Sequence, residues 1–181
     1  MAIALRPLRE DDWQAVHEWA RLPEVSRYQT WGPNSVEDTQ AYVAAALAAT
    51  ADPSNGYVWV AQRPDGRVVG NIELHLHAAQ DACGEVGYLM HPEVWGRGHA
   101  TAAAARVVEF AFTELGLHRV QATCHPDNRA SARVLDKLGM TREGRLRENL
   151  RMRDGSWRDS EMFAVLAREW RRPDVLVPLT V

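Results

Sequence analysis

Two glycines and a small residue, placed between an apolar strand and a long helix, could together bind an anion. The segment Trp95-Gly96-Arg97-Gly98-His99-Ala100-Thr101 follows an apolar run and precedes an alanine-rich stretch. Glycine lets the backbone turn tightly and approach a ligand, and the first N–H groups of a helix have no partner within the helix. These donors, together with the positive end of the helix dipole, suit a phosphate or pyrophosphate. The pattern by itself is equally compatible with an ordinary strand-to-helix loop.

Two familiar phosphate-binding motifs do not fit this segment. A dinucleotide-binding motif needs a third small residue at its sixth position, where Thr101 stands, and belongs to the first strand-helix unit of a doubly wound chain. A nucleotide-triphosphate loop ends in Gly-Lys-Ser/Thr, which is absent. Neither a dinucleotide nor a nucleoside triphosphate is therefore the expected ligand.

A second group of candidate residues lies on the strands before this segment. Along 67–76 the residues alternate, which puts apolar side chains on one face and Glu73, His75 and His77 on the other. Such a row could bind a metal, but no fourth ligand is evident, so we expect a solvated or pocket-facing row and no metal. Glu85 stands among apolar neighbours on the next strand.

Composition places the chain among ordinary globular proteins. Of its 181 residues 46% are hydrophobic and 25% charged, and the formal net charge is -3. This charge provides no overall attraction to nucleic acid or to an anionic membrane. Two cysteines, Cys83 and Cys124, are too few for a disulfide framework, and no segment resembles a signal peptide or a membrane span. We expect a cytoplasmic protein.

Periodicity and turn residues predict the elements that must position these groups. The expected strands are 3–8, 57–61, 67–76, 84–89, 118–123, 142–153 and 156–166, and the expected helices are 13–20, 35–50, 100–115 and 129–138. A strand-helix-strand unit around the glycines implies parallel neighbours, whereas the hairpins imply antiparallel pairs, so the sheet is mixed. We expect one domain over 1–168 and a tail, 169–181, without clear structure.

One loop also carries candidate residues. The stretch 22–34 contains Pro23, Gly32 and Pro33 and reads as irregular, yet it includes Tyr28 and Trp31. These aromatic residues could either line a substrate pocket or pack beneath the loop.

Two motifs resemble those of the GNAT superfamily of acyl-coenzyme A (CoA)-dependent N-acetyltransferases. The segment from Trp95 to Ala100 is similar to the pyrophosphate signature Gln/Arg-x-x-Gly-x-Gly/Ala, with tryptophan where glutamine or arginine is commonest. Asn128-Arg129-Ala130-Ser131, followed by Leu138-Gly139-Met140, is similar to the Asn-x-x-Ser and Leu-Gly-Phe of the Rim-type branch, which acetylates N-termini of ribosomal proteins. The resemblance extends from about Leu5 to Leu166.

The resemblance implies an α/β (α+β) GNAT fold, with a central mixed, mostly antiparallel seven-stranded sheet and helices on both faces. It also implies acetyl-CoA as the acetyl donor, with the pantetheine arm between two splayed strands. The implied cofactor-binding residues are Leu89, Met90, His91, Gly96, Arg97, Gly98, His99, Ala100, Thr101, Asn128, Ser131 and Lys137.

The expected reaction needs a proton acceptor for the amine, a donor that polarises the carbonyl, and a proton source for the leaving thiolate. Glu85 or Glu73 could accept the amine proton, directly or through water, and for each a structural salt bridge is the alternative. A backbone N–H near Met90 would polarise the carbonyl. Ser131, matched to the family motif, would protonate the sulfur, and its alternative role is a hydroxyl in the first turn of a helix.

The acceptor implied by the resemblance is a protein or peptide N-terminus, with Tyr28 and Trp31 as substrate-binding candidates. A small amine (an amino acid, aminoglycoside, polyamine or toxin) is the alternative, because the family uses one fold for many amines. A non-catalytic acyl-CoA sensor is a further alternative. The sequence leaves open whether acyl groups other than acetyl are used and whether the protein forms a homodimer. Arginines of the last hairpin could track nucleic acid, but interleaved acidic residues favour an ion-paired, solvated hairpin.

Overall fold

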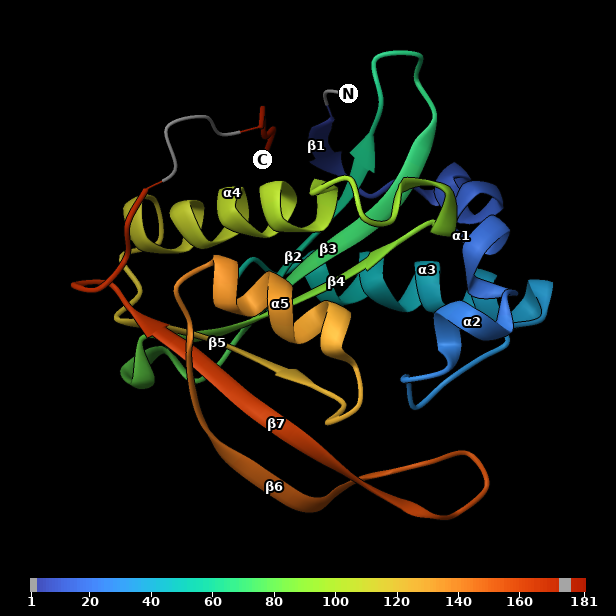
Figure 1. The fold of residues 1–181 in the computed structure, drawn as a ribbon. Coiled ribbons are helices and arrows are strands. Elements are labelled where there is room, and N and C mark those ends of the chain that lie inside the picture. The colour runs from blue at the N-terminus through green and yellow to red at the C-terminus, as the bar shows by residue number, and fades with distance from the viewer. Residues whose placement is uncertain (1–2, 173–176) are drawn as a thin grey trace.

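Seven strands form one sheet in the computed structural model, which describes residues 3–172 and 177–181 (Figure 1). The strand order is β1-β2-β3-β4-β5-β7-β6. Among the seven described strands only β4 and β5 pair in parallel, and the other neighbours are antiparallel. The strands are β1 (Ala4–Pro7), β2 (Gly56–Gln62), β3 (Val68–Leu76), β4 (Cys83–Met90), β5 (Arg119–Cys124), β6 (Thr141–Arg151) and β7 (Trp157–Leu166). The predicted mixed, mostly antiparallel sheet is confirmed.

Helices cover both faces of the sheet, as expected. On one face lie α1 (Trp13–Ala20), α2 (Pro23–Ser26) and α3 (Val36–Thr50), and on the other lie α4 (His99–Thr113) and α5 (Arg129–Lys137). Short 3-10 helices are η1 (Glu10–Asp12), η2 (Ala79–Asp81) and η3 (Pro92–Val94). The prediction of an irregular stretch at 22–34 is wrong for α2, where Pro23 occupies the first helical position that proline favours.

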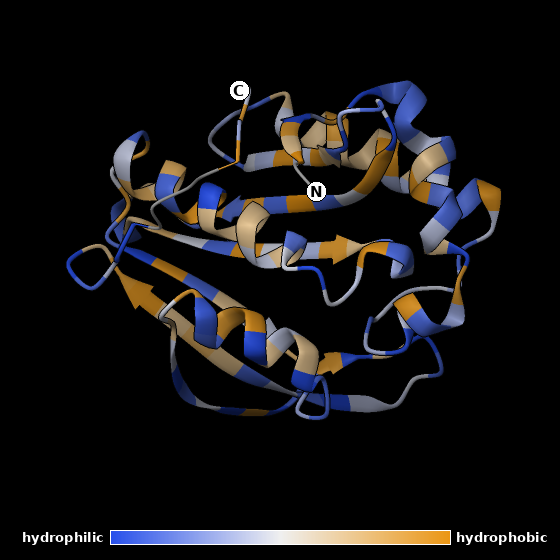
Figure 2. Ribbon diagram, turned by 45° about the horizontal axis from the view of Figure 1, so that its top comes forward, coloured by the Kyte–Doolittle hydropathy of each residue, from blue (hydrophilic) through white to orange (hydrophobic). Residues whose placement is uncertain are grey.

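Alternation along the strands divides the core between the two faces, and the strands of Figure 2 are banded in orange and blue accordingly. On β3, Ile72 and Leu74 point toward α4 and belong to the larger core cluster. Val60 of β2 and Val68 of β3 belong to a second cluster with residues of α1 and α3. The polar residues Asn71, Glu73 and His75 therefore lie on the α1–α3 face.

The parallel strands β4 and β5 separate after three residue pairs. Pairing runs from Cys83–Arg119 to Glu85–Gln121 and then stops, while β5 goes on pairing with β7 as far as Cys124. Figure 1 shows the two strands diverging beyond this point. The second half of β4 thus has one edge that no strand of the described residues covers, and this opening positions the site.

The C-terminal residues differ from the structureless tail that we expected. Leu5 N–H donates to the Pro178 carbonyl (2.8 Å), Thr180 N–H donates to the Leu5 carbonyl (2.9 Å), and the Trp59 indole donates to the Thr180 carbonyl (2.9 Å). Residues 177–181 therefore lie along β1. The part of the tail at 173–176 lies outside the described residues. Within the described chain, no helix is both long and apolar enough to span a bilayer.

Candidate active site

One cavity of about 1140 Å³ occupies the opening between β4 and β5 and continues beneath the α1–α3 layer. Its walls include Val86 to Met90 of β4 and Ala122 to Cys124 of β5. It also reaches the start of α4, the start of α5 and the α2–α3 loop. The volume suffices for two substrates that meet in the opening.

The glycine segment forms an open cradle at the start of α4. Gly96 and Gly98 have φ values of 73° and 80°, the left-handed region that favours glycine, and a Cβ on either would meet no atom within 4 Å. Gly98 is the N-cap of α4 and supplies no side chain, so the first N–H groups of the helix stay available. The donors and the free space above both glycines fit a phosphate group.

His99 adds a second sign of a ligand beside the cradle. Its side chain is 5% exposed and lines the cavity, and its buried Nε2 has no hydrogen-bond partner among the described residues. Burial, with nearby positive charges, lowers its pKa, so the ring is neutral at neutral pH. A buried polar atom without a partner is costly, and an oxygen atom of a bound ligand could satisfy it.

The free edge of β4 is formed by Tyr88 and Met90. His91 N–H donates to the Val69 carbonyl of β3 (2.8 Å), and because backbone groups alternate along a strand, those of Met90 and Tyr88 face the opening. Leu89 instead pairs with β3, so of the three residues predicted to pair with the pantetheine arm, only Met90 lies with its backbone at the edge. The Trp95 indole donates to the Met90 carbonyl (2.7 Å), which fastens the cradle to this edge.

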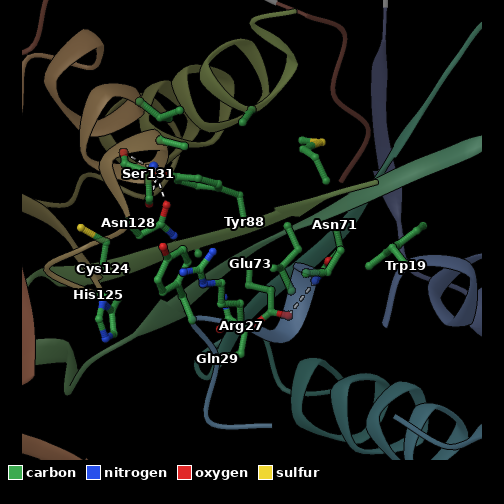
Figure 3. Close-up of a pocket in the computed structure, with 18 of the residues that line it drawn as sticks. Trp19, Arg27, Gln29, Asn71, Glu73, Tyr88, Cys124, His125, Asn128 and Ser131 are labelled. Atoms are coloured by element: carbon green, nitrogen blue, oxygen red, sulfur yellow. Dashed lines mark hydrogen bonds between the residues drawn. The ribbon is translucent and has the colours of Figure 1, made fainter. Parts of the chain in front are cut away.

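Tyr88 and Ser131 meet across the opening. The Tyr88 hydroxyl lies 2.9 Å from Ser131 Oγ, and Asn128 Oδ1 accepts a hydrogen bond from Ser131 N–H (3.1 Å), so Asn128 caps α5 (Figure 3). Burial raises the pKa of Tyr88 well above its ordinary value, so the phenol keeps its proton at neutral pH. The pair can therefore donate a proton into the opening.

Glu73 lies in a network of donors on the α1–α3 face. It accepts hydrogen bonds from the Tyr42 hydroxyl, from Asn71 Nδ2 (2.9 Å) and from His75 Nε2 (3.0 Å). Burial raises its pKa, but the bonds from His75 and Tyr42 outweigh burial and leave the pKa below its ordinary value. Glu73 is thus an ionised carboxylate whose lone pairs are largely occupied.

Glu85 stands where β4 and β5 separate. Gln121 Nε2 and Thr123 Oγ1 each donate a hydrogen bond of 3.2 Å to its carboxylate, and His77 Nε2 lies 4.0 Å from it. Its two donors are neutral side chains, so more of its lone pairs are unoccupied than at Glu73.

Gly87 lies between these two carboxylates on the same face. It is two residues from Glu85 on β4 and directly opposite Glu73 on β3. A Cβ on Gly87 would meet no atom within 4 Å, and its φ lies outside the left-handed region. Neither the backbone nor the packing requires glycine here. The residue keeps open a space bounded by Glu73 and Glu85.

The other predicted site residues are distributed as follows. Tyr28 lines the cavity with its ring 5.0 Å from that of His125, and Trp31 lines the cavity while also packing on the α1–α3 core. Ala100, Thr101 and Lys137 line the cavity as well, whereas His91 and Arg97 do not. The structure therefore brings most of the predicted residues together at one cavity.

Comparison with known proteins identifies the family. Residues 3–141 match the model of the acetyltransferase (GNAT) domain. The chain belongs to this family. It is 31% identical to the uncharacterized N-acetyltransferase YnaD of Bacillus subtilis, with 93% of this chain and 95% of YnaD aligned. The structure of Mycobacterium smegmatis RimJ in complex with CoA-disulfide superposes with a TM-score of 0.78 at 29% identity, covering 93% and 86% of the two chains. A spermidine N(1)-acetyltransferase of Escherichia coli is 24% identical over 93% of this chain and 88% of its own.

Three residues of this GNAT site were not identified from the sequence. Tyr88 reads as one more apolar strand residue, Gly87 as an interruption of that strand, and Asn71 as a polar strand position. Only pairing across the sheet reveals their surroundings. A glycine in a strand with an unremarkable φ is the one signal that could have indicated Gly87.

Proposed function

We propose that the protein transfers an acetyl group from acetyl-CoA directly to a primary amine, with both substrates bound at once. One observation carries this proposal. A single cavity joins the cradle of Gly96 and Gly98 to the space over Gly87 that Glu73 and Glu85 bound. An anionic donor fits the first part and a cationic amine fits the second. Family membership supports the same reaction.

The chain has suitable groups to bind the donor. The N–H groups of the cradle would hold the pyrophosphate, and the free edge at Met90 and Tyr88 would pair with the pantetheine arm. Acetyl-CoA supplies the thioester carbonyl when bound. The Met90 N–H, the remaining backbone donor at that position, would polarise this carbonyl.

Glu85 is the proton acceptor that the geometry favours. An ammonium must lose a proton before its nitrogen can attack, and Glu85 lies where the opening begins, with two neutral hydrogen-bond donors. Glu73 has three donors, one of them His75, and its lowered pKa makes it a weaker base. We assign Glu73 to attracting and orienting the cation.

Ser131 and Tyr88 form the proton source. The expelled thiolate needs a proton, and Ser131 Oγ, 2.9 Å from the Tyr88 hydroxyl, could pass one on and be resupplied by the phenol. Ser131 also stands in the first turn of α5, so the structural and catalytic roles coexist.

We propose a protein or peptide N-terminus as the acceptor class, with a small amine as the alternative. The first is supported by the likeness to RimJ, and the alternative by the likeness to a spermidine acetyltransferase. The aromatic residues Tyr28 and Trp31 would contact the acceptor, and the reaction would take place in the cytoplasm.

The test measures thiol release from acetyl-CoA with a panel of peptides, amino acids and polyamines. Ser131→Ala and Glu85→Gln should each lower kcat by about 100-fold, the usual scale of acid-base catalysis. Glu143→Gln is the matched control, because Glu143 pairs with Arg119 outside the cavity. Near-wild-type rates for both variants would refute the assignments. CoA binding without thiol release for any amine would favour the acyl-CoA sensor.

A further inference from the structure

Two arginines of the last hairpin line the cavity, Arg153 and Arg158, and of these Arg158 lacks a carboxylate partner among the described residues. Arg145 pairs with Asp159 (2.7 Å), Arg153 pairs with Asp38 (3.6 Å), and Arg142 pairs with Glu161. These pairs agree with the ion-paired hairpin that the sequence predicted. Arg158 forms no ion pair with any Asp or Glu among the described residues, although it lines the cavity.

Arg158 is also half-buried, which makes the missing partner costly. Its guanidinium donates to the Tyr28 carbonyl, and its buried Nε has no partner within the described chain. Burial lowers its pKa, with no carboxylate to oppose the effect. A buried cation is ordinarily paired with an anion, because desolvation is otherwise uncompensated.

A second arginine, Arg27, lines the same part of the cavity. Arg27 lies with its guanidinium 5.3 Å from the Tyr28 ring centre, and the Tyr28 ring packs on His125. Burial and then the charge of Arg158 lower the pKa of His125, which favours the neutral form of its ring. Arg27 and Arg158 thus form a positive wall beside Tyr28 and His125.

The opposite end of the cavity has the reverse character. Glu73 and Glu85 are acceptors, and Asn71, 2% exposed, has a buried Oδ1 without a partner in the described structure. Because Asn71 Nδ2 donates to Glu73 and Tyr42, the carbonyl oxygen is the free end of this amide. In the view of Figure 3, Asn71 and Glu73 lie toward one end, His125 toward the other, and Arg27 between them.

We propose that the acceptor carries a carboxylate as well as its amine, and that Arg158, assisted by Arg27, binds this carboxylate while Glu73, Glu85 and Asn71 hold the ammonium. A guanidinium fork matches a carboxylate in two parallel hydrogen bonds, and the free Nε belongs to such a fork. The inference rests on the proposed function and specifies its substrate. The carboxylate is either the free terminus of an amino acid or short peptide, or an acidic side chain beside a protein N-terminus.

The experiment compares acceptors that differ only in the carboxylate. Glycine, diglycine and triglycine are each paired with their C-terminal amides, which also varies the distance between amine and carboxylate. Two amide-capped peptides that begin Ala-Glu and Ala-Gln represent the side-chain source. We measure kcat/KM for each with the wild type and with Arg158→Gln, and the intrinsic reactivity of each amine cancels in the ratio between the two proteins.

In Arg158→Gln, kcat/KM should fall about 10- to 100-fold for the preferred acid, the scale of a hydrogen-bonded charge pair. For its amide it should fall by less than about threefold. Arg145→Gln is the control, since Arg145 lies outside the cavity, and it should leave both unchanged. A response confined to the free acids, or to the Ala-Glu peptide, supports the proposal and identifies the source of the carboxylate.

Two results would overturn the inference. One is an equal kcat/KM of the wild type for acid and amide in every pair, a result that can be obtained even if Arg158→Gln fails to fold. The other is an equal fall for acid and amide in the folded variant. If no amine leads to thiol release from acetyl-CoA, the proposed function is wrong independently of this inference. Calorimetric binding of diglycine and of its amide in the presence of CoA then tests the carboxylate site, and equal affinities would count against it.

Discussion

Replacing Gly98 by valine should weaken donor binding beyond what the added backbone strain alone would cause. A side chain at φ 80° costs about 1–2 kcal/mol in the left-handed region. For a domain of this size that corresponds to a fall in Tm of roughly 2–8 °C. The added methyl groups would project into the open cradle and displace a phosphate from its N–H donors.

The structure supplies a matched control for the backbone strain. Gly66 has φ 87° and, like Gly98, nothing within 4 Å of an added Cβ, but it lies in the turn between β2 and β3, outside the cavity. Gly66→Val should lose similar stability and bind CoA normally. In Gly98→Val, the loss of one hydrogen bond to a charged group, about 1.5–3 kcal/mol, should raise the Kd of CoA about 10- to 100-fold.

Isothermal titration with CoA and thermal unfolding of both variants and the wild type separate the two effects. If folded Gly98→Val binds CoA with the wild-type Kd, the cradle does not hold the pyrophosphate. If Gly66→Val weakens CoA binding as much as Gly98→Val does, strain rather than ligand exclusion explains the loss.

Three further outcomes follow from the same geometry. Gly87→Val should lower kcat/KM for the amine at least about tenfold without loss of stability, because its Cβ enters open space on a strand; Gly144→Val on β6, whose Cβ also meets nothing, is the control, and an active Gly87 variant would contradict the acceptor site. Tyr88→Phe should lower kcat about tenfold with KM for acetyl-CoA unchanged, since the phenol acts through Ser131; an unaltered kcat would remove it from the proton path. In the folded protein the pKa of Glu73 is lowered and that of His75 is raised, so the pair stabilises the fold fully between about pH 4.5 and about pH 6.5. This stabilisation is lost at lower pH, where Glu73 gains a proton, and at higher pH, where His75 loses one. The free energy of urea unfolding of the wild type should therefore exceed that of Glu73→Gln by the most near pH 5.5, and the Glu73–His75 pair should account for less than about 1 kcal/mol of this difference. A difference that grows toward pH 9 would contradict the pairing.

Local chemistry made much of the fold predictable. The alternation of 67–76, the Asp154-Gly155 turn and the glycines at 96 and 98 act within a few residues, through side-chain direction and left-handed φ. The capping of α5 by Asn128 is equally local, since its partner is Ser131 N–H three residues on. The order of elements, the mixed sheet and the cradle were therefore accessible from the sequence.

Contacts between distant residues decided the chemistry of the site. Tyr88 reaches Ser131 over 43 residues, Tyr42 reaches Glu73 over 31, and Arg158 reaches the Tyr28 carbonyl over 130. The sequence named Glu73 and Glu85 as equal candidates, because nothing nearby in the chain shows which donors surround each carboxylate. Burial and hydrogen-bond partners set a pKa and leave a guanidinium without a counter-charge, and both arise only when separate strands and helices pack together.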